Sequence, residues 1–209
     1  MIELFIIGIV IGILVSCPMG PIGMLCIQRT LSKGRLSGFI SGLGAAFSDI
    51  LYAVATCLFL GLLVNFIQAH ERSLQIFGSI IIVLFGYIIF RSNPAKNLQP
   101  NHEPKQTLVQ DFVTAFLLTF SNMLIVIFFI GLFAQFGFIL PEHSIQMTVA
   151  GLVGIFTGAI LWWFFITFVV SLMRHWFNLK GIKLLNKLMG GLIMTLAVIG
   201  FIAAIRFPL

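Results

Sequence analysis

The chain has 209 residues, of which 60% are hydrophobic and only 9% are charged. Soluble domains carry about 25% charged residues, so this composition excludes an ordinary soluble domain and predicts an all-α integral membrane protein. The net charge of +6 is distributed as the two sides of a membrane would distribute it, so it does not indicate affinity for nucleic acid.

Charged and strongly polar residues divide the chain into six apolar segments, each near the length of about 20 residues that a transmembrane helix needs. We therefore expect a single membrane domain, residues 1–209, with six transmembrane helices. The predicted spans are Leu4–Gln28, Gly38–Val64, Leu74–Phe90, Phe112–Leu140, Ile145–Met173 and Leu188–Ile205.

The first predicted span contains the motif Ser16-Cys17-Pro18-Met19-Gly20-Pro21-Ile22-Gly23. Two prolines and two glycines within eight residues disfavour a continuous helix, because each proline lacks a backbone N–H and clashes with the preceding turn. Transporters use broken helices to hold substrates near the middle of the bilayer. We predict a broken first helix whose break binds a solute, and a kink that only shapes helix packing is the alternative. The candidate binding residues are Pro18, Gly20, Pro21 and Gly23.

The second predicted span carries small and polar residues at steps of three and four positions, which places them on one helical face. They are Gly38, Gly42, Ala45, Asp49, Tyr52 and Thr56. Gly38 and Gly42 are predicted to let another helix approach closely. Asp49 is the only acidic residue deep within any predicted span, and a charged carboxylate there costs several kcal/mol unless it gains a proton, a partner or water. We predict that Asp49 faces a cavity and carries a proton, and a permanently neutral, structural aspartate is the alternative.

Ten of the twelve basic residues fall in the first, third and fifth loops. They are Arg29, Lys33, Arg35, Arg91, Lys96, Lys105, Arg174, Lys180, Lys183 and Lys187, whereas Arg72 and Arg206 lie on the other side. Because cytoplasmic loops are rich in lysine and arginine, we predict a multi-pass protein of the plasma (inner) membrane with cytoplasmic odd loops and external termini.

A polar linker at 91–111 separates a first half, 1–90, from a second half, 112–209. Three spans in each half give the halves opposite orientations, which is the condition for an inverted repeat. Asn122 lies about ten residues into the fourth span, near the midplane, and we place it opposite the first-span break in the solute site. An asparagine that hydrogen-bonds a neighbouring helix is the alternative. Gly154 and Gly158 of the fifth span are predicted helix-packing positions.

The run Pro18-Met19-Gly20-Pro21, followed by Gly34, Gly38 and Gly42 leading to Asp49 and Tyr52, resembles the LysE-type exporters of lysine, homoserine, threonine and related amino acids. The length, the six apolar segments and the central linker match as well. The chain has Asn122-Met123-Leu124 where members of that family commonly have Asn-Pro, so the sequence leaves open whether the fourth helix is broken.

The resemblance implies a secondary transporter that exports amino acids or related small solutes, coupled to proton entry, and not an enzyme. It implies a small-molecule solute, protons and the lipid bilayer as partners, and no cofactor. The solute itself and the oligomeric state, including a homo-oligomer, are left open.

Three other functions compete with this one. A metal-ion exporter on the same scaffold would use Asp49 with the sulfur atoms of Cys17 and Cys57, but the four histidines lie in loops and we predict no metal site. A membrane enzyme would need paired reactive cysteines or a nucleophile beside a base, and neither pattern is present. A purely structural protein would not need a broken, acid-bearing core.

Overall fold

The structure is a computed structural model, and it describes residues 1–17, 20–61, 70–91, 107–122, 124–140, 143–172 and 179–206. The regular structure within these residues is α-helical, as the composition predicts. The helices are α1 (Ile2–Ser16), α2 (Pro21–Lys33), α3 (Arg35–Gly61), α5 (Glu71–Arg91), α6 (Leu108–Phe120), α7 (Leu124–Gln135), α8 (Ile145–Leu172) and α9 (Leu179–Arg206). Pro18 and most of the predicted linker at 91–111 lie outside the described residues.

Two helices, α3 and α8, are each long and apolar enough to cross a membrane. Two further pairs qualify only when each pair is taken together. The α1–α2 pair is bent by 81° at the first break, between Ser16 and Pro21, and the α6–α7 pair is bent by 71° at the second break, between Phe120 and Leu124. The described residues thus hold two candidate spans, or up to four if each bent pair is one span. The chain is therefore a multi-pass membrane protein, whereas its six spans stay a prediction.

The first break falls at the prolines of the sequence motif. The helix α1 ends at Ser16, and the proline at position 18 has no N–H to donate to the Leu14 carbonyl, so the helical hydrogen bonding cannot continue. Gly20 precedes α2 in an extended conformation, and Pro21 occupies the first helical position. A proline is favourable there because the missing N–H would have no helical acceptor.

Glycines let α1 and α8 touch through their backbones. A Cβ atom placed on Gly8 would lie 2.1 Å from the carbonyl oxygen of Gly151, and one placed on Gly158 would lie 2.2 Å from that of Ile9. Side chains cannot occupy such a space, so only glycine permits this approach. The contact fixes the N-terminal helix against a helix of the second half of the chain.

The same kind of contact joins α3 and α6, in which a Cβ atom on Gly44 would lie 2.3 Å from the carbonyl oxygen of Phe112. The helices α5 and α9 also meet at glycines, because a Cβ atom on Gly190 would lie 2.6 Å from the backbone nitrogen of Phe90. Three close helix pairs therefore each join the first half of the chain to the second.

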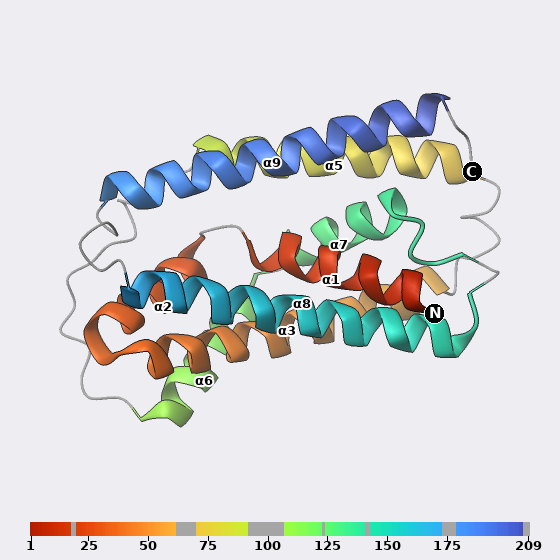
Figure 1. Cartoon of the computed structure of the whole chain (residues 1–209). Helices are drawn as coiled ribbons and strands as arrows, with labels where there is room; N and C mark the ends of the chain where they lie inside the picture. The colour runs from red at the N-terminus through yellow and green to blue at the C-terminus, as the bar shows by residue number, and fades with distance from the viewer. Residues whose placement is uncertain are drawn as a thin grey trace.

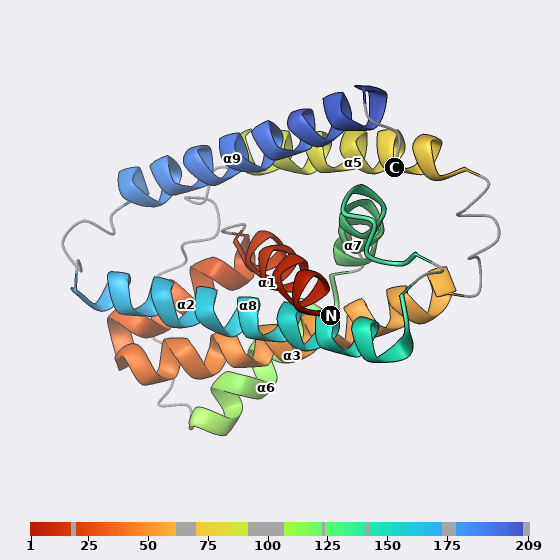
Figure 2. The same cartoon turned by 45° about the vertical axis from the view of Figure 1, so that its right-hand side comes forward.

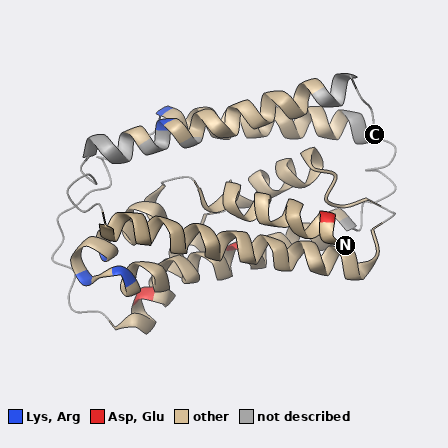
Figure 3. Ribbon diagram, in the orientation of Figure 1, with Lys and Arg blue, Asp and Glu red and all other residues tan. Residues whose placement is uncertain are grey.

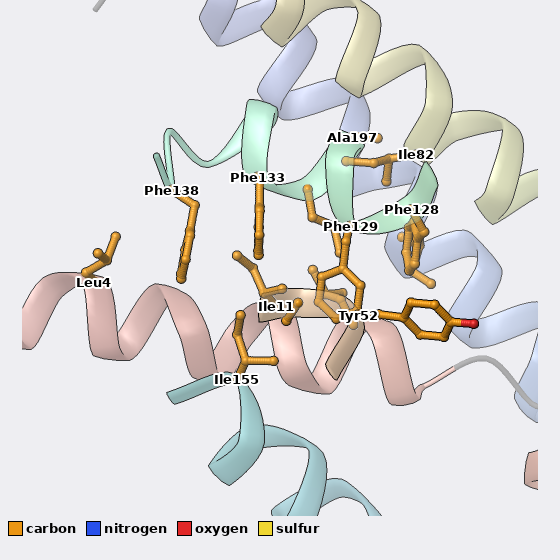
Figure 4. Close-up of a cluster of buried hydrophobic side chains, with 14 residues drawn as sticks. Leu4, Ile11, Tyr52, Ile82, Phe128, Phe129, Phe133, Phe138, Ile155 and Ala197 are labelled. Atoms are coloured by element: carbon orange, nitrogen blue, oxygen red, sulfur yellow. The ribbon is translucent and has the colours of Figure 1, made fainter. Parts of the chain in front are cut away.

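The helices form two parts, which Figures 1 and 2 show from different sides. The paired α5 and α9 run side by side along one face, and α7 lies between this pair and α1 (Figure 2). Buried apolar side chains fill the junction around α7, and Figure 4 shows them together. They include Leu4, Ile11, Tyr52, Ile82, Phe128, Phe129, Phe133, Phe138, Ile155 and Ala197.

The charged residues agree with a bundle that stands across a bilayer. Figure 3 shows lysines and arginines where α2 ends and α3 begins and on the paired α5 and α9, towards the same side of the molecule, and the first residue lies on the opposite side. Large apolar side chains are exposed on the outer faces of the long helices, for example Leu58 at 68% and Phe165 at 55%. Lipid would cover such faces.

Candidate functional site

The centre of the candidate site is the buried carboxyl group of Asp49, in the middle of α3. Only 4% of Asp49 is exposed. Its Oδ2 atom accepts a hydrogen bond of 3.3 Å from the hydroxyl group of Ser16, the last residue of α1. The acid predicted to carry a proton therefore lies beside the first break.

One helical turn further along α3, Tyr52 reaches the second break. Its hydroxyl group donates to the carbonyl oxygen of Phe120, the last residue of α6. The two rings are stacked, with their centroids 5.4 Å apart and their planes inclined by 17°. In a continuous helix that carbonyl would accept from the N–H of residue 124, so the tyrosine takes over the role of a helical donor. This contact explains how a helix breaks here without a proline.

Serine and threonine side chains add to the second break. The Thr119 hydroxyl group donates to the carbonyl of Ala115, and the Ser121 hydroxyl group donates to the carbonyl of Leu117. Such hydrogen bonds to the preceding turn weaken and bend helices. Asn122 lies in the second break and is exposed, and its backbone N–H group donates to the carbonyl oxygen of Thr119 at 2.9 Å.

The first break is open beside Gly20. A Cβ atom on Gly20 would meet none of the described residues within 4 Å, and Pro21 next to it is exposed. The N-cap residue of α2 is Gly20, which supplies no side-chain cap, and the N–H groups of a first helical turn have no acceptor within their own helix. Gly23 is buried one turn into α2, and Pro18 lies outside the described residues.

Buried polar groups without hydrogen-bond partners lie on the helices that flank this centre. They are the hydroxyl groups of Ser48 and Thr56 on α3 and the indole N–H groups of Trp162 and Trp163 on α8. Buried polar atoms normally have a partner, and an unpaired one often marks bound water or ligand. Ser48 and Thr56 stand one turn before and one turn after Tyr52, so the hydroxyl groups follow one face of α3.

The predicted packing glycines all make close helix contacts. A Cβ atom on Gly38 would lie 2.8 Å from the carbonyl oxygen of Cys26 on α2, and one on Gly42 would lie 2.5 Å from the ring of Trp163. Gly154 and Gly158 contact the backbone of α1. These positions fix the helices around Asp49 without contributing chemical groups.

An ion cluster missed by sequence reasoning lies at the end of the bundle that carries the basic residues. Arg29 of α2 is 2% exposed and Asp111 of α6 is 1% exposed, and the arginine Nε lies 3.2 Å from the carboxylate Oδ1. The sequence placed both residues at the edges of polar loops. In the sequence, each of the two residues is marked only by its position next to an apolar run. Their pairing is not visible there, because the two residues are far apart in the chain.

The cysteines and the apolar cavities contribute no polar chemistry near Asp49. Cys17, Cys26 and Cys57 are free thiols, and the first two are buried. Among the described side chains, no three histidine, cysteine or acidic residues gather where they could hold a metal ion. A cavity of about 50 Å³ between α3, α5 and α7 is lined by apolar residues such as Leu60, about 16 Å along α3 from Asp49 at helical rise.

Comparison with known proteins adds an independent line of evidence. Residues 13–203 match the family model described as LysE type translocator. The chain is 28% identical over 211 residues to the Bacillus subtilis (strain 168) protein named "Putative amino acid efflux protein YcgF", with 95% of this chain and 94% of that protein covered. No solved structure matches.

Proposed function

Because the chain belongs to the LysE type translocator family, we propose that it exports amino acids or related small solutes, with the entry of protons as the driving reaction. The family membership points to a translocator rather than an enzyme. The Bacillus subtilis relative is named as a putative amino acid efflux protein, and we propose the same class of solute for this chain.

The observation that carries the proposal is the position of Asp49 between two helix breaks. Its carboxyl group is buried against Ser16 at the first break, and the hydroxyl group of the neighbouring Tyr52 donates to the Phe120 carbonyl at the second break. A buried carboxyl group is neutral when protonated and needs compensation when it is charged. Solute binding at the first break and proton binding at Asp49 would then influence each other through the end of α1.

The first break is suited to a zwitterion. The Leu14 carbonyl at the end of α1 has no helical donor, because Pro18 carries no N–H group, and it can accept from an ammonium group. The uncapped N-terminus of α2 offers N–H groups and a positive partial charge to a carboxylate. An α-amino acid carries both charges on adjacent groups, so one break is able to bind both. We propose Pro18, Gly20, Pro21 and Gly23 as this part of the site and Asn122 as its far wall.

The proton gradient is large enough for export. One charge that crosses ~150 mV releases about 3.5 kcal/mol, which supports a solute gradient of roughly several hundredfold. One protonation of Asp49 per solute would therefore suffice.

An inverted repeat would account for the packing of the two halves. In such a repeat α1 corresponds to α6, α3 to α8 and α5 to α9. Under this correspondence the α1–α8 contact becomes the α6–α3 contact, and the α5–α9 contact stays the same. Each half also has one bent pair. This reciprocity supports a proposal of two inverted three-span repeats.

The test is efflux from proteoliposomes loaded with a panel of amino acids, with and without an imposed pH gradient. We expect Asp49→Asn to remain folded and membrane-inserted and to lose efflux driven by the pH gradient, because asparagine cannot carry a proton. Asp49→Glu should keep part of the activity. Wild-type proton-coupled efflux by Asp49→Asn would remove the aspartate from the mechanism.

A further inference from the structure

The cluster around Arg29 and Asp111 uses every polar group of the arginine. In addition to the 3.2 Å contact with the carboxylate, one terminal nitrogen of Arg29 donates to the Ser41 hydroxyl group at 2.9 Å and to the Asp111 carbonyl at 2.8 Å. The other terminal nitrogen donates to the Thr114 hydroxyl group at 2.9 Å. A guanidinium group bound on all sides in this way holds its position much more tightly than a single ion pair would.

The carboxylate of Asp111 is shared with two further donors. Lys33 lies 3.2 Å from its Oδ1 atom, and the Ser37 hydroxyl group donates to its Oδ2 atom. The lysine side chain is 18% exposed, whereas those of Arg29 and Asp111 are almost fully buried. Lys33 therefore stands at the solvent edge of the cluster.

This cluster joins α3 to the two half-helices α2 and α6, at the ends of these half-helices that lie far from the breaks. Arg29 belongs to α2, the half-helix that follows the first break, and Asp111 belongs to α6, the half-helix that precedes the second break. Ser41 of α3 lies between them. The ion pair thus links α2, the half-helix that follows Gly20 and the first break, to α6 across the two halves of the chain.

The corresponding half-helix of the second half, α7, is held differently. A Cβ atom on Gly78 of α5 would lie 2.7 Å from the carbonyl oxygen of Gly131 on α7, and the side chain of Gln135 donates to the Leu196 carbonyl of α9 at 3.1 Å. In the described part of the chain, α2 packs mainly with α3 and also with α8 and α6, whereas α7 packs mainly with α5 and less extensively with α3 and α1. The two half-helices therefore have different main packing partners.

We propose that Arg29 and Asp111 are positioning residues that form a latch, which holds α2 against α3 and α6 in the described conformation and opens when α2 moves during transport. This inference rests on the proposed function, since only a transporter needs the first break to change its access. Lys33 is the last residue of α2 and moves together with Arg29. When α2 moves, the Ser37 hydroxyl group of α3 is the donor that stays on the Asp111 carboxylate.

The latch can be tested by a distance measurement that requires no solute. Spin labels are attached to cysteines at Ser32 on α2 and Val109 on α6, both exposed, in a background without the native cysteines. Pulsed electron spin resonance then gives the distribution of distances between the labels. We expect one dominant distance with the latch intact. Arg29→Gln and Asp111→Asn should each increase a second, longer-distance population at least about fivefold, in the usual range of conformational coupling.

The matched control is Arg35→Gln, which removes the same charge at the same end of the bundle. Arg35 lies 4.4 Å from the ring centre of Phe164 and 4.8 Å from that of Phe168, outside the latch, so we expect the distance distribution to stay as in the wild type. The double variant Arg29→Gln/Asp111→Asn avoids an unpaired buried charge. It keeps the test decisive if a single variant fails to fold.

An unchanged distribution in the double variant would overturn the latch, as would an equal effect of Arg35→Gln. The proposed function is judged separately, by efflux of the panel of amino acids. A shifted distance distribution without any amino acid efflux would refute the solute assignment and keep the latch. Amino acid efflux together with an unchanged distance distribution in the double variant would support the solute assignment and refute the latch.

Discussion

At the scale of single residues, α3 presents a carboxyl group and a phenol three positions apart, about 4.5 Å along the helix. Asp49 contacts the end of α1 and Tyr52 contacts the end of α6. One helix thus contacts both breaks, so a small displacement at either break changes a contact of this pair of side chains.

Tyr52→Phe tests whether the hydroxyl group stabilises the second break. The phenylalanine keeps the stacking on Phe120 but leaves the Phe120 carbonyl without its donor, so we expect the free energy of unfolding to fall by about 1–3 kcal/mol. Thermal unfolding of the purified protein measures this. Tyr87→Phe is the control, because Tyr87 is 49% exposed, and its loss should be close to zero. Equal losses in both variants would show that the second break does not depend on the hydroxyl group.

Single residues also show how much of the candidate site could be predicted from the sequence. Asp49 could be selected because a lone acid in an apolar run is conspicuous by itself. Arg29 could not, because a basic residue at the end of a span normally faces water, and its burial depends on Asp111, 82 positions away in the chain. A single sequence does not show such a pairing.

At the scale of elements, the two breaks differ in how they arise. The first break is caused by prolines, because a missing backbone N–H group interrupts the hydrogen bonding of the helix at that position. The second depends on a hydroxyl group from another helix and on serine and threonine bonds that are common in unbroken membrane helices. For that reason the sequence predicted a break in the first span and left the fourth open.

Gly20→Leu tests the first break as a binding element. The backbone at Gly20 (φ −75°, ψ −161°) suits any residue, and an added side chain has open space, so we expect normal folding. The leucine would fill the break and abolish solute binding and efflux. Gly191→Leu is the matched control, because Gly191 on α9 also has nothing within 4 Å of a Cβ atom. Unchanged solute affinity in Gly20→Leu would place the solute elsewhere.

Gly158→Ala tests the contact between α1 and α8. The methyl group would lie 2.2 Å from the Ile9 carbonyl oxygen, so the helices must separate, at an expected loss of about 1–3 kcal/mol of stability. Gly191→Ala should leave the unfolding midpoint unchanged. A Gly158→Ala protein as stable as Gly191→Ala would mean that α1 shifts along α8 without loss.

At the scale of the whole molecule, the described basic residues gather at one end of the bundle (Figure 3). The sequence predicts that this end is cytoplasmic. A cysteine at Asn101, in the linker between α5 and α6, should therefore resist an impermeant maleimide added to intact cells and react once the cells are opened. Rapid labelling in intact cells would reverse the predicted orientation.

The membrane character of the chain could be predicted from the sequence because apolar length is a local property, whereas the number of six spans stays a prediction beside the two to four candidate spans of the described residues. The arrangement of the spans could not, because each close pair joins helices from different halves. The glycine spacing identified faces suited to close approach, but nothing in the spacing said which face meets which.

The contact between α1 and α8 has a consequence for biogenesis. Ribosomes add about 5–20 residues per second, so α1 enters the membrane on the order of ten seconds before α8 exists. During that time the glycine face of α1 has no partner and must be covered by lipid or by the insertion machinery. A chain truncated before α8 would keep this glycine face of α1 without its partner permanently.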